Sequence, residues 1–223
     1  MISLLTKSLI DKSEGIITIQ PEVRDNENHG YLMFDDGGVE VEVGEFIYGL
    51  TKILKPHRAL TTGIYTGISD MYISQAMIEN GYGHITALEF EIAHKERAEK
   101  LWLKTGTAKN IDAMLTDSRK FQPNGVYELM FLDTEPQQRF QELINFYPYL
   151  AEGGFVFMHD LANHMGQETI EGHEANWPWG KLPDEIVNWV KTGELIPWYF
   201  PNPRGLVGLR KKMKGLKPDY ESK

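Results

Sequence analysis

Short, strongly apolar runs alternate along the chain with longer segments that place apolar residues at helical spacing. The runs at residues 127–133 and 153–160 are almost entirely apolar, as expected of strands that are buried on both faces of a sheet. The predicted strands in this part of the chain are "RALTTG", "HITALEF", "IDAMLTD", "YELMFLD" and "GGFVFMHD".

Helices are predicted beside these strands, because apolar residues there recur every three or four positions. Ser69 is expected to cap one helix, and Gly81 and Gly106 are expected to end that helix and the next. Pro136 suits the first turn of a later helix. The predicted helices span residues 44–55, 69–80, 92–105, 136–150 and 182–192.

Alternating strands and helices predict an α/β protein with a mostly parallel sheet that is covered by helices on both faces. The last two strands, "IPWYF" and "GLVGLRK", are joined by only a few residues, so they are expected to pair antiparallel. Near the N-terminus, alternation of Val39, Val41 and Val43 predicts two short strands around an Asp-Asp-Gly-Gly turn in residues 31–43.

Composition narrows the class of protein. The length of 223 residues suggests one domain with additions, and 41% hydrophobic with 25% charged residues is ordinary globular usage. Cysteine is absent, which excludes disulfides and thiol catalysis and fits a cytoplasmic location. A formal charge of -9 argues against a nucleic-acid partner. No apolar run is long enough to span a membrane, and the first residues are interpreted as mature chain, not as a signal peptide.

Candidate chemistry lies where the strands end, because ligands of such sheets bind at the carboxyl ends of the strands. The loop "TGIYTGIS" follows the first of these strands. A phosphate-binding P-loop requires a lysine after its last glycine, and none follows Gly67. A dinucleotide fingerprint requires a second glycine where Tyr65 stands, and that side chain would block a pyrophosphate. Either the loop binds a ligand with ribose and adenine but no phosphate, or its glycines only let a strand turn into a helix.

Two further strand ends favour the adenosyl ligand. Glu89 follows Gly67 by about 22 residues, the usual distance for an acid that binds ribose hydroxyls. Asp117, together with Ser118, ends the third strand, where an adenine amino group would find an acceptor. Asp133 and Asp160 end the two strands that follow.

Residues 44–160 resemble a class I S-adenosylmethionine-dependent methyltransferase of the small-molecule O-methyltransferase kind. The stretches that carry the resemblance occur in the family's order and spacing, and they are "ALTTGIYTGIS", "ITALEFE", "YELMFLDTEP" and "LAEGGFVFMHD". The resemblance implies a Rossmann-like, mostly parallel sheet of seven strands with an antiparallel last strand. It also implies a methyltransferase domain at residues 44–223, after an N-terminal extension with a short hairpin at residues 1–43.

The resemblance also implies roles for single residues. The backbone of the glycine loop would approach the methionine part of the cofactor, whose carboxylate would lie at the start of the next helix. Asp133 and Asp160 would flank the sulfonium and the acceptor, and both count as candidate catalytic residues. The implied cofactor-binding residues are Gly63, Tyr65, Gly67, Ser69, Glu89, Asp117, Ser118 and Asp133.

The chain departs from the family pattern at three positions. The family usually has an acid where this chain has Thr61. Metal-dependent members have a lysine at the position of Pro136, and asparagine or aspartate at the position of Leu161. These departures weaken a metal-dependent mechanism.

Removal of a proton from the acceptor hydroxyl has two candidate routes. A divalent metal such as Mg²⁺ would take oxygen ligands from Asp133 and Asp160, and the set could be completed by Asn163 or Glu168. A histidine base would be His159 or His164. The remaining interpretation of residues 159–180 is a polar loop whose histidine and glutamate side chains are solvated. Trp177 and Trp179 in this segment would either cover an acceptor pocket or pack as a hydrophobic clamp on the sheet edge.

These observations predict a cytoplasmic S-adenosylmethionine-dependent enzyme that methylates a hydroxyl of a small molecule, a sugar or a natural product. The N-terminal extension is expected to cap the site or to build a homodimer. One alternative is a non-catalytic binding or assembly module with the same fold. The other is an NAD-dependent oxidoreductase, against which Tyr65 counts.

Overall fold

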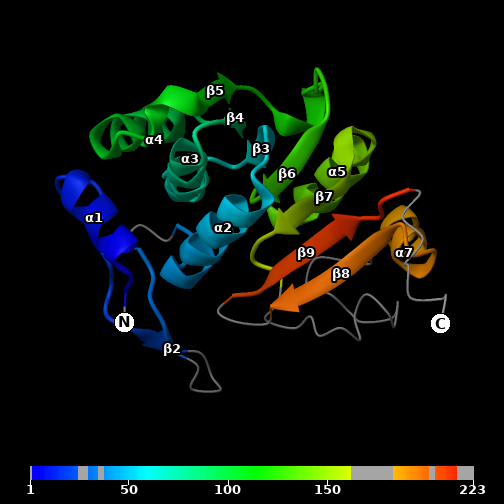
Figure 1. Ribbon diagram of the computed structural model, residues 1–223, viewed down its shortest axis with the longest axis horizontal. Coiled ribbons are helices and arrows are strands. Elements are labelled where there is room, and N and C mark those ends of the chain that lie inside the picture. The colour runs from blue at the N-terminus through cyan, green and yellow to red at the C-terminus, as the bar shows by residue number, and fades with distance from the viewer. Residues whose placement is uncertain (1, 25–29, 35–37, 162–182, 201–203, 215–223) are drawn as a thin grey trace.

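The computed structural model describes residues 2–24, 30–34, 38–161, 183–200 and 204–214. Its centre is a seven-stranded sheet with the strand order β5-β4-β3-β6-β7-β9-β8 (Figure 1). The strands are β3 (Arg58–Thr62), β4 (His84–Glu89), β5 (Ile111–Leu115), β6 (Tyr127–Leu132), β7 (Leu150–Met158), β8 (Leu195–Phe200) and β9 (Leu206–Lys211).

The sheet is parallel except at one strand. Strands β3 to β7 pair in parallel, whereas β9 pairs antiparallel with both β7 and β8. The predicted α/β class, Rossmann-like sheet of seven strands and antiparallel last strand are therefore confirmed. The strand order also shows that the chain reverses direction across the sheet between β3 and β6, and ligands of such sheets bind at this place.

Helices cover both faces of the sheet (Figure 1). Helices α2, α3 and α4 pack on one face, and α5 and α7 pack on the other. Short 3₁₀ turns follow α4, β5 and α5, at residues 108–110, 118–120 and 147–149. The helices are α1 (Leu4–Lys12), α2 (Val41–Leu54), α3 (Ile68–Asn80), α4 (Ile92–Thr105), α5 (Pro136–Phe146) and α7 (Asp184–Lys191).

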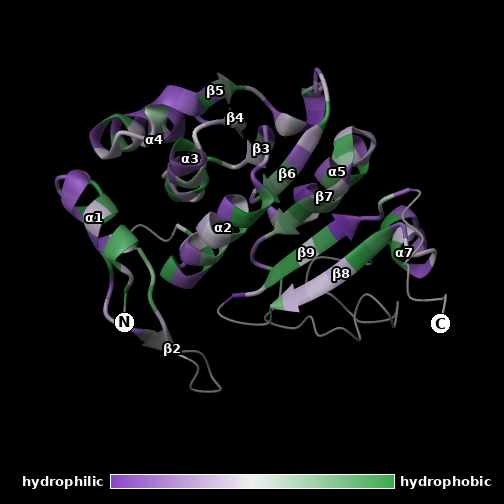
Figure 2. Cartoon of the chain, in the orientation of Figure 1, coloured by the Kyte–Doolittle hydropathy of each residue, from purple (hydrophilic) through white to green (hydrophobic). Residues whose placement is uncertain are grey.

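Alternate strand residues build two hydrophobic cores. In β6, Leu129 and Phe131 face the core beneath α2, α3 and α4, whereas Met130 and Leu132 face the core beneath α5 and α7. In Figure 2, β9 is mostly hydrophobic until its last residues, whereas the surrounding helices contain both hydrophobic and hydrophilic residues. Both cores reach the end of the sheet where β6 stops, so the residues that follow are held between two packed layers.

The helix ends follow local chemistry. Gly81 and Gly106 adopt left-handed backbone at the ends of α3 and α4, and Pro136 occupies the first turn of α5, as predicted. Ser69 does not cap α3. Gly67, with φ of 78°, takes the capping position, because a turn this tight requires left-handed backbone directly before Ile68.

The N-terminal region differs from its prediction. The strand expected around Val41 and Val43 is wrong, because both residues lie in the first turn of α2 and are buried. Val43, Ile47 and Thr51 form one buried row at a spacing of four, so the helical pattern wins over the local alternation. A two-residue antiparallel ladder instead joins β1 (Val23–Arg24) and β2 (Gly30–Tyr31).

Helix α1 was not predicted by the apolar pattern. Leu9 on this helix, and Ile17 and Phe34 after it, belong to the same core as Ile47 of α2. The predicted boundary between residues 43 and 44 falls inside α2, so the N-terminal segment and the sheet share one core. No helix in the described ranges is long and apolar enough to cross a membrane.

Candidate active site

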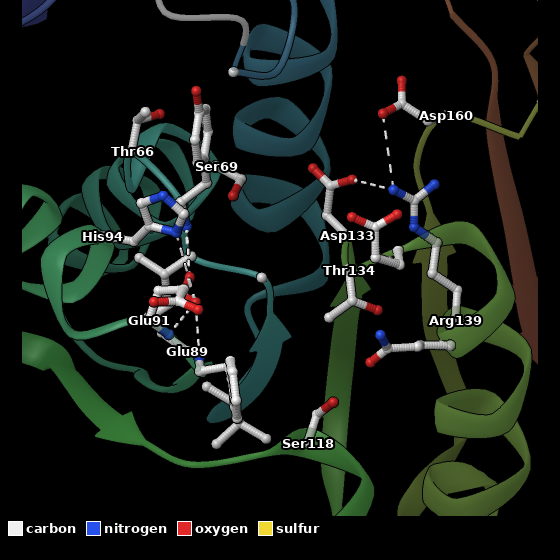
Figure 3. A pocket seen from close by; sticks show the side chains of 18 of the residues that line it. Thr66, Ser69, Glu89, Glu91, His94, Ser118, Asp133, Thr134, Arg139 and Asp160 are labelled. Atoms are coloured by element: carbon white, nitrogen blue, oxygen red, sulfur yellow. Dashed lines mark hydrogen bonds and ion pairs between the residues drawn. The ribbon is translucent and has the colours of Figure 1, made fainter.

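A cavity of about 910 Å³ opens at the carboxyl ends of the parallel strands (Figure 3). That volume lies in the range of pockets that bind small molecules and cofactors. Residues that follow five strands line it, together with Gly38 and Val39 of the N-terminal segment and Arg204 before β9. The sequence-predicted site residues that line it are Gly63, Tyr65, Ser69, Glu89, Asp117, Ser118, Asp133 and Asp160.

The glycine loop after β3 is tightly enclosed. A Cβ on Gly63 would lie 2.3 Å from the backbone oxygen of Asp133, and one on Gly67 would lie 2.6 Å from Trp102 Nε1. Gly63, Tyr65 and Gly67 all have positive φ. Only glycine fits the two outer positions, and the loop is therefore clamped between the end of β6 and α4.

Glu89 is the buried carboxylate at the end of β4. Its Oε2 accepts a hydrogen bond from the Tyr65 backbone at 2.9 Å, and its Oε1 accepts from the backbone of Phe90 at 2.7 Å and Glu91 at 2.9 Å. These three donors hold the carboxylate against the glycine loop, and it faces the cavity (Figure 3). A carboxylate has about four lone-pair sites, so Glu89 retains capacity to accept from a ligand hydroxyl.

An acid does lie behind the glycine loop, although Thr61 replaces the residue expected there. Thr61 Oγ1 donates to Asp70 Oδ1 at 2.6 Å, and Asp70 comes from the first turn of α3. Asp70 is fully buried, and its Oδ2 has no hydrogen-bond partner among the described residues. Burial, with the nearby charges of Glu89 and Asp133, raises the pKa of Asp70 to about 7 despite the bond from Thr61.

The end of β5 brings Asp117 and Ser118 to the cavity. Asp117 accepts from the backbone and the guanidinium of Arg119, and this pairing lowers the pKa of Asp117 to about 2. Ser118 is buried and donates to Glu142 of α5. The two residues predicted to hold an adenine therefore differ: one is an ion-paired carboxylate, and the other is a hydroxyl with a fixed partner.

A buried charge cluster occupies the opposite end of the cavity. His159, which follows β7, is fully buried and lies 2.7 Å from Glu40 Oε2 through Nε2 and 3.3 Å from Asp133 Oδ1 through Nδ1. Burial alone would lower the pKa of His159, but the charges and hydrogen bonds of Asp133 and Glu40 raise it to about 10. His159 is therefore an imidazolium near neutral pH, which argues against its predicted role as a base.

Two arginines complete this cluster. Arg139 of α5 lies 3.1 Å from Asp133 and 3.7 Å from Asp160, and Arg204 Nε lies 3.2 Å from Asp160 and also pairs with Glu40. Burial alone would raise the pKa values of Glu40 and Asp133, but the surrounding cations lower both. Three cations thus face three carboxylates in one network, of which Figure 3 shows Arg139 with Asp133 and Asp160.

The cluster offers Asp160 most openly to the cavity. The Asp160 side chain is 33% exposed against 17% for Asp133, and Asp160 adopts left-handed backbone with φ of 55°. Such backbone is uncommon for a non-glycine residue and is often found at functional sites. It turns the carboxylate out of the strand direction toward Arg139 and Arg204.

The donor set does not suit a divalent metal. Glu40, His159 and Asp160 can bring ligand atoms within 4.8 Å of one another. However, a metal requires a neutral imidazole, and the charges of Asp133 and Glu40, which raise the pKa of His159 to about 10, favour the imidazolium form. Each carboxylate that would ligate the ion is already paired with Arg139 or Arg204. The predicted ligands Asn163 and Glu168, the alternative base His164, and Trp177 and Trp179 lie outside the described residues.

Several residues of the site were not found from the sequence. Glu40 and Arg204 reach the cluster from segments remote from it in the chain, and no motif marks them. The sequence marks Arg139 only weakly as a site residue. It lies one helical turn after Pro136, and Pro136 is the position at which metal-dependent members of the resembled family have a lysine. Asp70 and Glu142 are buried acids whose hydroxyl partners, Thr61 and Ser118, come from other elements, so no local pattern marks them.

Comparison with known proteins identifies the domain. A family model described as a methyltransferase domain matches residues 60–161. The fold is similar to the S-adenosylhomocysteine-bound methyltransferase PaMTH1 from Podospora anserina, with 15% identity, a TM-score of 0.62, and coverage of 92% of this chain and 88% of that chain. Comparison with curated proteins finds no match.

Two bacterial structures extend the likeness. One is the O-methyltransferase TomG from Streptomyces achromogenes, involved in tomaymycin synthesis and bound to S-adenosylmethionine, with 12% identity, a TM-score of 0.58, and coverage of 78% of this chain and 82% of that chain. The other is an S-adenosylhomocysteine complex of an O-methyltransferase from Bacillus cereus, with 13% identity, a TM-score of 0.57, and coverage of 78% and 83%. At these identities the likeness concerns the fold.

Proposed function

We propose that the chain is a class I S-adenosylmethionine-dependent methyltransferase and that it transfers a methyl group to a hydroxyl oxygen of a small molecule. The observation that carries this proposal is a single cavity with Glu89 at one end and the paired carboxylates Asp133 and Asp160 at the other. When bound, S-adenosylmethionine supplies an electrophilic methyl group. We infer that the acceptor is a sugar or a natural product; TomG, which has a similar fold, is involved in tomaymycin synthesis.

The Glu89 end suits the adenosyl part of the cofactor. Three backbone donors orient the Glu89 carboxylate, and its remaining lone-pair site would accept from a ribose hydroxyl. Tyr65 occupies the place where a dinucleotide site needs glycine, so the loop favours a ligand without a pyrophosphate. Ser69, in the first turn of α3, lies where a helix N-terminus favours a carboxylate.

The Asp160 end suits an acceptor hydroxyl. Asp160 is the more exposed of the two carboxylates, and we assign it to receive the hydroxyl proton as the new carbon–oxygen bond forms. Asp133, bonded by Arg139 and His159, would hold the acceptor and the methyl donor in line. His159 and Glu40 act as positioning residues, because buried His159 contacts Asp133 and buried Glu40 in turn contacts His159.

Cations of the protein itself replace a metal in this scheme. Arg139 and Arg204 lie within 3.7 Å of Asp160 and balance its charge. We therefore propose a reaction that does not depend on a divalent ion. Only residues of the chain are needed to align the acceptor and to accept its proton.

A methyl-transfer assay tests this function. The protein is incubated with S-adenosylmethionine and a panel of sugars and hydroxylated aromatic compounds, with and without EDTA, and release of S-adenosylhomocysteine is measured. We expect turnover with at least one class of acceptor, unchanged by EDTA. Binding of NAD in place of S-adenosylmethionine would favour the oxidoreductase instead. Absence of S-adenosylhomocysteine binding up to millimolar concentration would favour a non-catalytic module.

A further inference from the structure

A fully buried carboxylate, Glu142, lies beneath the base of the cavity. It comes from α5, and three hydroxyl groups donate to it. Thr62 Oγ1 and Thr134 Oγ1 each donate to Oε2 at 3.0 Å, and Ser118 Oγ donates to Oε1. These hydroxyls come from three different strand ends, so one side chain of the helix gathers the ends of β3, β5 and β6.

The three bonds fix the direction of each hydroxyl proton. A serine or threonine hydroxyl has one proton to donate and two lone pairs with which to accept. Because that proton points inward to Glu142, the cavity-facing side of the hydroxyl can only accept. Ser118 and Thr134 both line the cavity, to the right of Glu89 in the view of Figure 3. This part of the wall therefore presents acceptors and no hydroxyl donor from these two residues.

We propose that Glu142 sets the hydrogen-bond polarity of this wall and thereby selects a purine that carries an amino group at position 6. The inference rests on the proposed function, which places an adenosyl ligand in the cavity. The 6-amino group of adenine is a donor and matches Ser118 and Thr134. A 6-oxo group, as in hypoxanthine, is an acceptor and would meet acceptor lone pairs, so a buried polar group would stay unpaired.

The ionised form of Glu142 is the form that accepts all three bonds. Burial raises the pKa of this carboxyl, while the bonds from Ser118, Thr62 and Thr134 and the charge of Arg139 oppose the rise. Measurements are therefore made at about pH 8, because a higher pH favours the ionised form.

Calorimetric titration with two ligands tests the inference. S-adenosylhomocysteine and S-inosylhomocysteine, its 6-oxo analogue, differ only at the base. We expect the wild-type protein to bind the adenosyl ligand at least about tenfold more tightly, the consequence of one mispaired buried group. In Glu142→Gln the amide nitrogen must donate to at least one of the two cavity hydroxyls, which frees that hydroxyl's proton for the ligand. The preference should then fall to about threefold or less.

Two further variants separate polarity from folding. Glu128→Gln makes the same chemical change in β6, where Glu128 accepts from the Arg58 backbone and does not line the cavity, so the preference should stay at the wild-type value. Ser118→Ala removes one fixed acceptor and should also reduce the preference, which provides the test if Glu142→Gln does not fold. A merely structural role of Glu142 would weaken both ligands equally and leave their ratio unchanged.

The outcomes distinguish this inference from the function on which it rests. If the wild type binds S-adenosylhomocysteine but shows no preference, or if both Glu142→Gln and Ser118→Ala keep the full preference, the role of Glu142 is wrong and the proposed function stands. If the wild type binds neither ligand, the proposed function fails, and the inference fails with it.

Discussion

Asp70 shows how a single buried residue can stand in for another. Its carboxylate lies behind the glycine loop, bonded to Thr61, close to where the resembled family places an acid. The acid comes from the helix after the loop and not from the strand before it. Because Asp70 Oδ2 is buried without a partner, the charged form is costly in the folded protein.

This cost predicts the pH dependence of stability at Asp70. The pKa is raised from 3.8 to about 7, so the contribution of Asp70 to folding is greatest below pH 3.8 and is lost as the pH rises toward 7. That shift corresponds to roughly 4 kcal/mol as an upper bound. We expect Asp70→Asn to be more stable than the wild type at about pH 8 but not at about pH 4, measured by urea unfolding.

The control for this prediction is Asp11→Asn, because Asp11 is an exposed aspartate of α1. It should show no such difference between the two pH values. A loss of stability in Asp70→Asn that is equal at both values would contradict the assignment of the cost to the charged carboxylate.

Asp160 carries the second prediction at the residue scale. If it receives the acceptor proton, Asp160→Asn should lower kcat by about 10²- to 10⁴-fold while the affinity for S-adenosylhomocysteine changes by less than about threefold. Glu91→Gln is a matched control, since Glu91 also lines the cavity but at the ribose end. An unchanged kcat in Asp160→Asn would refute the assignment.

At the scale of elements, one charge network joins three segments that are far apart in the chain. Glu40 lies at the start of α2, His159 follows β7, and Arg204 precedes β9. Arg204 also donates to the Gly38 backbone, which fastens the N-terminal segment to the last hairpin. The wall of the acceptor end is thus built from both ends of the fold, and its parts depend on each other.

Removal of Glu40 should therefore destabilise the fold. Glu40→Ala leaves buried His159 with one partner fewer, and we expect a loss of about 3–5 kcal/mol in the free energy of unfolding. Glu42→Ala is the control, because Glu42 is exposed on the same helix and accepts from the Leu32 backbone. A loss in Glu40→Ala no larger than that in Glu42→Ala would show that the network contributes little.

The same network makes the stability difference between the wild type and Glu40→Ala depend on pH. The pKa of His159 is raised from 6.5 to about 10, so its contribution is complete below 6.5 and is lost as the pH rises toward 10. The pKa of Glu40 is lowered from 4.5, so its contribution is present above 4.5 and is lost as the pH falls. The gap between the wild type and Glu40→Ala should be widest between about pH 5 and pH 8.

Elements with a strong local signal could be predicted, and elements fixed by tertiary contacts could not. The strands with continuous apolar runs and the helices ended by Gly81 and Gly106 were found, because periodicity and capping are local properties. The residues that follow the strands could be predicted as site residues, because the ends of the strands are also marked locally in the sequence. The start of α2 was missed, because alternation of Val41 and Val43 fits a strand locally and only burial against α3 decides for a helix.

The charge network could not be predicted for a different reason. Glu40 and His159 are 119 residues apart in the chain, and nothing in either local sequence marks the contact. A base at His159 was one of the alternatives left open by the sequence, whereas the charges of its partners Asp133 and Glu40 raise its pKa to about 10. The polarity of Ser118 was likewise invisible, because Glu142 reaches it only once α5 packs on the sheet.

At the scale of the molecule, the two cores and the cavity share one cause. The parallel strands β4, β6 and β7 bury their last apolar residues, Leu88, Leu132 and Met158, between the helical layers. The polar residues that follow emerge together at one edge of the sheet. Since β3 and β6 are neighbours there while their helices lie on opposite faces, the edge is open between them and holds the cavity.

The central claim is that this cavity binds an adenosyl cofactor through Glu89. Calorimetric titration with S-adenosylhomocysteine, on the wild type and on Glu89→Ala, tests it most directly. We expect binding by the wild type and a loss of about 1–3 kcal/mol in Glu89→Ala, the value of charge-assisted bonds to the ribose. An unchanged dissociation constant in Glu89→Ala, or tight binding of NAD without any binding of S-adenosylhomocysteine, would contradict it.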